Sequence, residues 1–468
     1  METRNHRLTR RAFLGTMGLG MAGTAVLAAC APVATPTSAP KPTDAPKPAN
    51  TTAPAQSTVA PAQPTAVPAA KPKGVVRCHT RSGAYENAWK KTADLFKEQF
   101  PDVKIQIEPT PGGELPQKLL TMAAGGTIGD LFFTNIYTQD YQRYAVTGIS
   151  REMDEYATRD NIDWSQWYSV CVDMLRFNGH IYGMLLGGQP GRTGLFYHKQ
   201  IFQEAGVPAP DESWTFDTIM AQSPKLTQGG RLALYPPFRD VPELVIYLRS
   251  FGGDAYSPDG KKATLNSEAS KKAITWLWEG MHKRNYFTKP SDVGEDYQGY
   301  KALWSAGKLA MVAQGIFMMG WAKQSGVDFG LTLLPKGPVA RGSMTEVNYV
   351  AVAKATKNPD AAWEFAKALS GREAGIFHLE VGATPGARPD VYGDAKVLAD
   401  NPTMKVWLKS WENAMPFTAP ANLRGQEAND VIVQNLGAMW SGSATPDSGV
   451  IERANQLAQA VLDKPTVS

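Results

Sequence analysis

The sequence predicts an α/β fold of two lobes, each a mainly parallel sheet with helices on its faces. From Gly74 onward, apolar stretches with strand character alternate with stretches of helical periodicity, which is the pattern of a parallel sheet covered by helices. Glycine and proline in Gly187–Gly191 separate two apolar stretches, Ile181–Leu186 and Leu195–Tyr197, as expected where a chain crosses between lobes. On this stretch alone, an ordinary connection in a one-domain enzyme fits as well. The length from Gly74 to Ser468 accommodates two lobes of ordinary domain size.

The first thirty residues are predicted to be a targeting segment. Arg10 and Arg11 precede an apolar run, Ala12–Ala29, which is interrupted by glycine and threonine, as is typical of a twin-arginine signal peptide. A transmembrane anchor is the alternative, but the run is short for a stable span. The run ends in Leu27-Ala28-Ala29-Cys30, which resembles the lipobox at which bacterial lipoproteins are cut and acylated. We therefore expect a lipid on Cys30.

Residues 31–73 are predicted to be a disordered tether. They consist almost entirely of Pro, Ala, Thr, Ser and Gln and contain no aromatic residue, so they bury too little apolar surface to offset the entropy of ordering. A mucin-like glycosylated stalk has the same composition. The signal carries four Arg and one Glu, and the tether four Lys and one Asp, so the formal net charge falls from +4 for the whole chain to −2 for residues 74–468. No basic field remains to argue for nucleic acid.

The first predicted elements alternate between strand and helix. In order they are the strand Val75–His79, the helix Glu86–Gln99, the strand Val103–Ile107, the helix Pro116–Ala124 and the strand Gly129–Phe133. Ligands of such sheets bind beyond the carboxyl ends of the strands. The loops that leave those ends are 81–85 and 135–139.

Cys78 and Cys171 are the two cysteines that follow the tether. A disulfide between them would be allowed outside the membrane. Because Cys78 lies in a strand expected to be buried, we expect a free, inert thiol.

Short segments along the chain resemble the family 1 extracellular solute-binding proteins of bacterial ABC importers. These segments include "NGHIYG", "LFYHKQIFQEAG", "FKEQFPDVKIQI", "KLLTMAAGGTIGDLFF", "GKLAMVAQG" and "NPDAAWEFAKALSG". Each segment alone is common, but their order matches the family over nearly all of residues 74–468. His198 stands where the family usually has Asn, which leaves the start of the following helix less well capped.

The resemblance implies a two-lobed periplasmic-binding-protein fold whose chain crosses three times between the lobes. The crossings are expected near Gln189, Pro338 and Gly386. The N-terminal lobe would then consist of residues 74–188 and 341–384, and the C-terminal lobe of residues 189–340 and 385–468.

Catalytic motifs do not stand out in the chain. The sequence has no Gly-x-Ser-x-Gly, no His-Glu-x-x-His, no Cys-x-x-Cys and no phosphate-binding loop of the Gly-x-x-x-x-Gly-Lys type. We therefore predict no catalytic residue, no cofactor and no metal site. A glycosidase, which needs two carboxylates in a cleft, remains an alternative.

Aromatic residues suggest the class of ligand. Several lie in glycine- or proline-rich segments, where stacking on sugar rings is as natural as core packing. These include Tyr137, Phe238, Phe317 and Trp321. Helical periodicity instead assigns Trp89, Trp276, Trp278 and Trp363 to the lobe cores.

The resemblance also implies which regions contact the ligand. They are the loops after the first and third predicted strands, the first crossing, the aromatic after "AMVAQG" with a second aromatic one turn later, and two further regions of the second lobe. The implied ligand-binding residues are Arg81, Ser82, Asn135, Tyr137, Gln189, Arg192, Phe238, Phe317, Trp321, Asn422 and Arg424. Known sugar binders often have Trp in place of Phe317. The first crossing lacks an acidic residue, and Arg192 there suggests an anionic sugar or another acidic solute.

The resemblance therefore predicts a non-enzymatic lipoprotein that captures a small solute, in the first place a sugar or oligosaccharide, and delivers it to ABC permease subunits. The alternatives are a sugar phosphate, peptide or polyamine as solute, and a secreted carbohydrate-active enzyme on a similar tether. We expect a monomer held on the extracytoplasmic face of the cell membrane by Cys30, exported by the twin-arginine route, with no nucleic-acid partner.

Overall fold

A computed structural model describes residues 72–136, 139–294 and 298–467. The predicted signal peptide with Cys30, the predicted tether up to residue 71, and the predicted contact Tyr137 lie outside these ranges. Within them, none of the helices combines the length and the apolar character that crossing a membrane requires.

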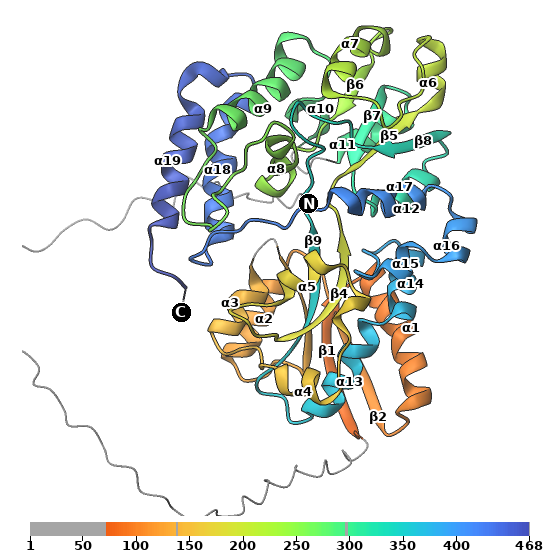
Figure 1. Cartoon of the computed structure of the whole chain (residues 1–468), viewed down its shortest axis with the longest axis vertical. Helices are drawn as coiled ribbons and strands as arrows, with labels where there is room; N and C mark the ends of the chain where they lie inside the picture. Colours follow the sequence, from red (N-terminus) through yellow and green to blue (C-terminus); the bar gives the residue numbers. More distant parts are fainter. Residues whose placement is uncertain (1–71, 137–138, 295–297, 468) are drawn as a thin grey trace, which may run out of the picture. The chain divides into compact units, whose positions relative to one another are not determined.

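The first sheet has five strands in the order β2-β1-β3-β9-β4 (Figure 1). Strands β1, β2 and β3 are mutually parallel, whereas β9 runs antiparallel to both β3 and β4. Four of the five strands therefore share one direction, which confirms the predicted mainly parallel sheet. The strands are β1 (Gly74–Arg81), β2 (Val103–Thr110), β3 (Leu131–Asn135), β4 (Gly183–Gln189) and β9 (Glu346–Val352).

The second sheet has four strands in the order β6-β7-β5-β8. Strands β6 and β7 are parallel, and β5 runs antiparallel to its neighbours β7 and β8. In each sheet the antiparallel strand, β9 or β5, is the one that the chain forms directly after it arrives from the other sheet. The strands are β5 (Gly194–His198), β6 (Leu232–Tyr235), β7 (Leu309–Gln314) and β8 (Phe329–Leu333).

Helices pack against each sheet. In the first lobe α1 contacts β1 and β2, α3 contacts β3, and α5 and α13 contact β4 and β9. Amphipathic sequence explains α1, which buries Ala88, Trp89, Thr92 and Phe96 on one face and ends before Pro101. The helices of this part are α1 (Ala84–Gln99), α2 (Leu115–Ala124), α3 (Asp140–Val146), α4 (Asp154–Arg159), α5 (Ser169–Leu175), α13 (Pro359–Leu369) and α14 (Arg372–Glu380).

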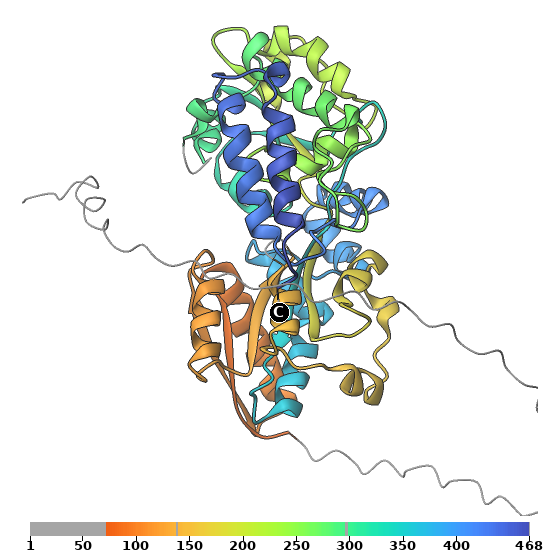
Figure 2. The same cartoon turned by 90° about the vertical axis from the view of Figure 1, so that its left-hand side faces the viewer.

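In the second lobe α6, α7 and α11 contact β5, β6 and β7 respectively, and α18 and α19 lie side by side (Figure 2). Short 3₁₀ turns occur at 164–166, 411–413 and 446–448, and a π turn at 279–283 follows α9. The helices here are α6 (Lys199–Glu204), α7 (Phe216–Leu226), α8 (Val241–Ser250), α9 (Glu268–Trp278), α10 (Pro290–Val293), α11 (Gly299–Ser305), α12 (Met318–Gln324), α15 (Pro389–Tyr392), α16 (Ala395–Asp400), α17 (Met404–Ser410), α18 (Gly425–Trp440) and α19 (Val450–Leu462).

Three segments connect the sheets: 190–193 between β4 and β5, 334–345 between β8 and β9, and the stretch from the end of α14 to α17, which packs on β5 and β8. Position 194 must be glycine where the third connecting segment packs on β5, because a Cβ there would lie 2.4 Å from Cη2 of Trp407. The division of every residue between the two lobes stays a prediction.

Several local predictions are confirmed. Trp89 and Trp363 are fully buried, and Trp276 and Trp278 pack partly buried against the core. Cys78 and Cys171 are buried and unpaired. Helix α6 begins at Lys199 without a side-chain hydrogen bond from His198.

Candidate functional site

The ends of strands from both sheets converge on two adjoining cavities. Arg81, Asn135 and Gln189 are the last residues of β1, β3 and β4, which run in one direction. Since β9 runs the opposite way, its first residue, Glu346, pairs with Gln189 and lies at the same edge. These are the carboxyl ends at which ligands of open α/β sheets bind.

The cavity on the side of the first sheet, here called the first-sheet cavity, has a volume of about 250 Å³. The second-sheet cavity has a volume of about 260 Å³. Both include Arg192 and Phe317 in their walls, so the two are neighbours. The first-sheet cavity is lined by Arg81, Ala84, Tyr85, Asn135, Gln189, Arg192, Phe317, Glu346, Asn348, Gly382, Ala383 and Thr384. The second-sheet cavity is lined by Arg192, Tyr235, Arg239, Glu243, Gln298, Tyr300, Lys301, Gln314, Phe317, Met318 and Trp321.

A buried cluster of charges lies where the cavities meet. Arg192, in the first crossing, contacts a carboxylate oxygen of Glu346 through Nη1 and donates from Nε to Oε1 of Glu243 over 3.2 Å. Gln189 donates from Nε2 to the other oxygen of Glu346 over 2.6 Å and accepts from the backbone N–H of Ile316 over 3.1 Å. One guanidinium therefore holds two carboxylates from different parts of the chain.

Burial affects both carboxyl groups. It raises the pKa of Glu346 to about 8, although the nearby positive charge of Arg81 lowers it. Burial also raises the pKa of Glu243, with Asp240 adding to the effect. The direct contacts with Arg192 stabilise the charged forms against this desolvation.

The first-sheet cavity has a second polar network. The hydroxyl of Tyr85 donates to Oγ1 of Thr384 over 3.0 Å and accepts from Nδ2 of Asn348 over 2.9 Å. These groups come from the start of α1, from the third crossing and from β9. Their mutual hydrogen bonds fix polar atoms in place along the wall, which lowers the cost of ordering them around a ligand.

Aromatic rings line the second-sheet cavity. Tyr235 and Tyr300 stack with centroids 4.2 Å apart, and Trp321 lies edge-on to Tyr300 at 6.4 Å. Phe317 is 36% exposed, which is unusual for a phenylalanine in this chain. Its centroid lies 5.6 Å from Cζ of Arg192, so the ring stands at the boundary of the two cavities.

The structure brings six of the predicted contact residues to the cavities: Arg81, Asn135, Gln189, Arg192, Phe317 and Trp321. Ser82, which follows directly, is exposed and lines neither cavity, and its backbone N–H donates to the carbonyl of Thr110.

Three other predicted residues lie outside the walls of both cavities. Phe238 is 2% exposed and packs 5.4 Å from the ring of Trp440. Asn422 donates from Nδ2 to the carbonyls of Val461 and Leu462, near the end of α19. Arg424 donates from Nε to the carbonyl of Pro465. Core packing and the tying down of the C-terminus explain these side chains, so we leave them out of the candidate site.

Several lining residues escaped the sequence analysis, namely Glu243, Glu346, Asn348, Tyr300 and Thr384. The acidic partners that the first crossing lacks come from α8 and β9 instead. Tyr85 lay in the predicted loop 81–85, and that position was its only signal.

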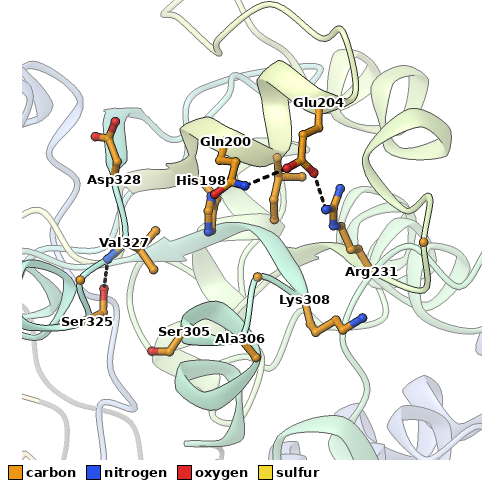
Figure 3. Close-up of a pocket in the computed structure, with 14 residues that line it drawn as sticks. His198, Gln200, Glu204, Arg231, Ser305, Ala306, Lys308, Ser325, Val327 and Asp328 are labelled. Carbon is orange, nitrogen blue, oxygen red and sulfur yellow. Dashed lines mark hydrogen bonds and ion pairs between the residues drawn. The ribbon is translucent and has the colours of Figure 1, made fainter.

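A larger cavity of about 500 Å³, here called the outer cavity, lies at the opposite edge of the second sheet (Figure 3). Its walls include the turns before β6, β7 and β8, that is, the amino ends of these parallel strands. Arg231 and Glu204 point toward each other across it, 2.5 Å apart. Because it lies at the amino ends of the strands, we do not assign the solute to it.

A metal site was not predicted. In the part of the chain that the structure describes, one group brings three ligand atoms within 4.8 Å of one another: Glu152, Asp154 and His180. The group is largely exposed, and Nδ1 of His180 lies 3.0 Å from Glu152 and 3.3 Å from Asp154, which is the arrangement of an ordinary ion pair.

Known proteins with similar sequences and folds are solute-binding proteins. The family profile described as "Bacterial extracellular solute-binding protein" matches residues 80–376. A lactose-binding protein of Rhizobium radiobacter is 25% identical over 260 residues, 53% of this chain and 58% of that protein.

Solved structures agree in fold. The ABC substrate-binding protein Lmo0181 of Listeria monocytogenes, in complex with cycloalternan, has a TM-score of 0.75 at 21% identity, covering 83% of this chain and 99% of that one. The GacH receptor of Streptomyces glaucescens, solved unliganded and with acarbose, has a TM-score of 0.72 at 22% identity over 84% and 99%. This is the predicted two-lobed binding-protein fold. The chain belongs to the bacterial extracellular solute-binding protein family.

Proposed function

We propose that this protein captures a sugar or oligosaccharide in the first-sheet and second-sheet cavities and delivers it to the permease of an ABC importer. The observation that carries the proposal is the partly exposed ring of Phe317 at the junction of two cavities with polar walls. An aromatic face complements the C–H face of a sugar ring, while fixed amide, hydroxyl and charged groups bind its hydroxyls.

Each polar network offers donors and acceptors of the kind that hydroxyls need. Gln189 and Glu346 carry them in one network and Tyr85, Asn348 and Thr384 in the other, and both networks line the first-sheet cavity. Similar proteins support the same class of ligand, since one is a lactose-binding protein and others are solved with cycloalternan or acarbose.

The cavity sizes support a small solute. About 250 and 260 Å³ lie just below the range of about 300–1,000 Å³ that is usual for small-molecule sites. A solute larger than one sugar ring would therefore extend from one cavity into the other, past Phe317.

Delivery to a permease requires the protein to stay near the membrane. We infer that acylated Cys30 anchors it on the extracytoplasmic face after export by the twin-arginine route, and that residues 31–73 serve as the tether. The protein acts as a monomer in this scheme, with one solute per chain.

A binding screen tests the proposed function. Isothermal titration calorimetry of the purified chain with neutral and acidic mono- and disaccharides, and with amino acids, dipeptides and polyamines, should find dissociation constants in the micromolar range or below for a sugar. Binding confined to peptides or polyamines would contradict a sugar ligand while leaving the family assignment intact.

A further inference from the structure

Arg81 is an arginine of the cavity wall that forms no ion pair with a carboxylate of the described residues. Its Cζ lies 4.5 Å from the ring centroid of Phe133 and 6.0 Å from that of Tyr85. Its Nε is buried and has no hydrogen-bond partner in the described part of the chain. No aspartate or glutamate there lies within ion-pair distance of its guanidinium, and its charge acts on nearby Glu346 only at longer range. A guanidinium that lies over aromatic rings and has no ion-pair partner in the cavity wall can bind an anionic group of a ligand.

The acidic groups of the cavities are already engaged. Glu346 contacts Arg192, and Glu243 lies 3.2 Å from Arg192 and 3.7 Å from Arg239. Arg192, which the sequence suggested as the anion-binding residue, therefore already has two carboxyl partners. Arg81, at the end of β1, differs from Arg192 because it has no such carboxyl partners among the described residues.

The charged side chains of the cavity walls also favour an acidic group on the solute. Among their described residues, the two cavities contain four cationic side chains, Arg81, Arg192, Arg239 and Lys301, but only two carboxylates, Glu243 and Glu346. Arg239 also lies 3.5 Å from Asp240, which is outside the lining, so Arg81 and Lys301 are the wall cations without an ion pair among the described residues. Because a partly enclosed cavity has a lower dielectric than water, an acidic group of the solute would interact favourably with these cations.

We propose that the solute carries an acidic group, a carboxylate or a phosphate, which the guanidinium of Arg81 binds. This inference rests on the proposed function, because it places the acidic group on a sugar or sugar derivative in the same cavities. The end of β1 orients Arg81, and stacking on Phe133 limits the rotamers it samples. A bidentate contact with two oxygens of one acidic group suits the planar guanidinium.

Paired ligands test the inference. We would titrate the whole chain with glucose, galactose, mannose and N-acetylglucosamine, each compared with its 6-phosphate and, for the first three, with its uronic acid. We expect at least one acidic member to bind roughly tenfold to a hundredfold more tightly than its neutral partner, as a charge-assisted contact provides. The two acidic arms distinguish a carboxylate from a phosphate. The affinity of the acidic member should fall as salt is raised.

Variants assign the effect to one residue. Arg81→Gln should remove the acidic preference, and Arg81→Lys should retain part of it, because lysine keeps the charge without the fork. The matched control is Arg176→Gln, since Arg176 also lies over a ring, 5.5 Å from the centroid of Trp164, but outside both cavities. The control should leave the acidic preference unchanged.

The outcomes separate the two proposals. Neutral sugars that bind as tightly as their acidic partners, or an acidic preference that survives Arg81→Gln, would overturn this inference and leave the proposed function standing. Failure of every sugar in this panel, together with every disaccharide of the binding screen above, would instead contradict the proposed function. Melting temperatures of all variants, measured in parallel, show that each is folded.

Discussion

The guanidinium of Arg192, in the first segment that joins the sheets, contacts the carboxylate of Glu346, which directly follows the second such segment. Glu346 is also the first residue of β9. Their ion pair therefore ties together two of the three connections between the lobes, and Glu243 of α8 completes it from the second lobe. The charges that shape the cavities also hold the region about which the lobes would move.

Arg192→Met should destabilise the protein strongly, because it leaves Glu243 and Glu346 buried without their shared cation. Breaking a buried ion pair on one side costs about 3–5 kcal/mol. The free energy of unfolding, measured in urea, checks the size of the loss. Combining Arg192→Met with Glu346→Leu should recover part of it, since one of the stranded charges is then removed.

The matched control for this change is Arg231→Met, which breaks a contact of similar length with Glu204 at the rim of the outer cavity. Because Glu204 is exposed, we expect little change in stability there. Equal losses for Arg192→Met and Arg231→Met would show that burial does not govern the first pair.

Much of the sheet edge that lines the first-sheet cavity could be predicted from the sequence, because the patterns that mark its strands are visible in short stretches of the chain. The loops that hold Arg81 and Asn135 were predicted because each follows a strand whose alternating or apolar pattern is visible along the chain, and the family resemblance implied Arg81, Asn135 and Gln189 themselves. Glu346 was missed because β9 is antiparallel, so its beginning, and not its end, reaches this edge. Strand direction depends on pairing with β3 and β4, which are distant in sequence.

The predicted contact residues that lie outside the cavities show a second limit of predicting a site from sequence. Correspondence with a family fixes the region in which Asn422 and Arg424 lie but not the partners of their side chains. Those partners are carbonyls near the C-terminus, such as Val461 and Pro465, about 40 residues further along. Phe238 likewise follows a strand that ends near the cavity, yet its ring packs on Trp440 of α18.

Stability should fall on acidification because of His378. This side chain is 0% exposed, donates from Nδ1 to the carbonyl of Ala374, and leaves Nε2 buried without a partner in the described residues. Burial lowers its pKa to about 4, from the usual value of about 6.5. The folded state therefore requires the neutral ring, and its contribution is fully present above about pH 6.5 and is lost as the pH falls toward 4.

His378→Asn should flatten this dependence, because asparagine can donate the same hydrogen bond and does not titrate. The free energy of unfolding of the native protein should drop by up to about 3 kcal/mol more than that of the variant between pH 6.5 and 4. Burial lowers the pKa of His79 and His198 too, so part of the slope should remain. Identical slopes for the two proteins would refute a buried neutral His378.

Cys30→Ala should release the protein from the membrane without changing its affinity for solute. The acyl group would be attached some forty residues before the first strand, so its loss does not reach the cavities. Fractionation of cells that express the native chain or the variant, followed by calorimetry of the released protein, measures both effects. Equal retention of the two in the membrane fraction would contradict the lipid anchor.

Gln139 joins the loop after β3 to the segment before α18. Its Nε2 donates to the carbonyl of Pro420 over 2.9 Å, and its Oε1 accepts from the backbone N–H of Gly425 over 2.9 Å. The residue adopts a positive φ of 54° and is 4% exposed, so these hydrogen bonds hold an unfavourable backbone in place. They connect the start of α3, which packs on β3, to the start of α18, which packs on α8 and α19 of the second lobe.

Gln139→Ala should therefore favour separation of the lobes. Without solute, small-angle scattering should give a larger radius of gyration than for the native chain, and solute should reduce the radius in both. Affinity should weaken, because a smaller fraction of molecules is ready to bind. Gln203→Ala, which changes an exposed glutamine of α6, is the control and should behave as the native protein does. An unchanged radius despite measured binding would argue for a rigid site.

Phe317→Ala is the sharpest test of where the solute lies, because Phe238, a buried phenylalanine of the same lobe, provides a contrasting variant. Phe317 is 36% exposed at the junction of the cavities, so truncation should remove apolar contact worth roughly 1–3 kcal/mol, or about tenfold to a hundredfold in affinity, with little change in melting temperature. Phe238 is 2% exposed and packed on Trp440, so Phe238→Ala should lower the melting temperature markedly, by a loss of about 3–5 kcal/mol, and affect affinity less. Measuring affinity and melting temperature for both variants shows whether each ring contacts the solute or packs in the core. A large fall in melting temperature with unchanged affinity for Phe317→Ala would show that its ring is a core element and that the solute binds elsewhere.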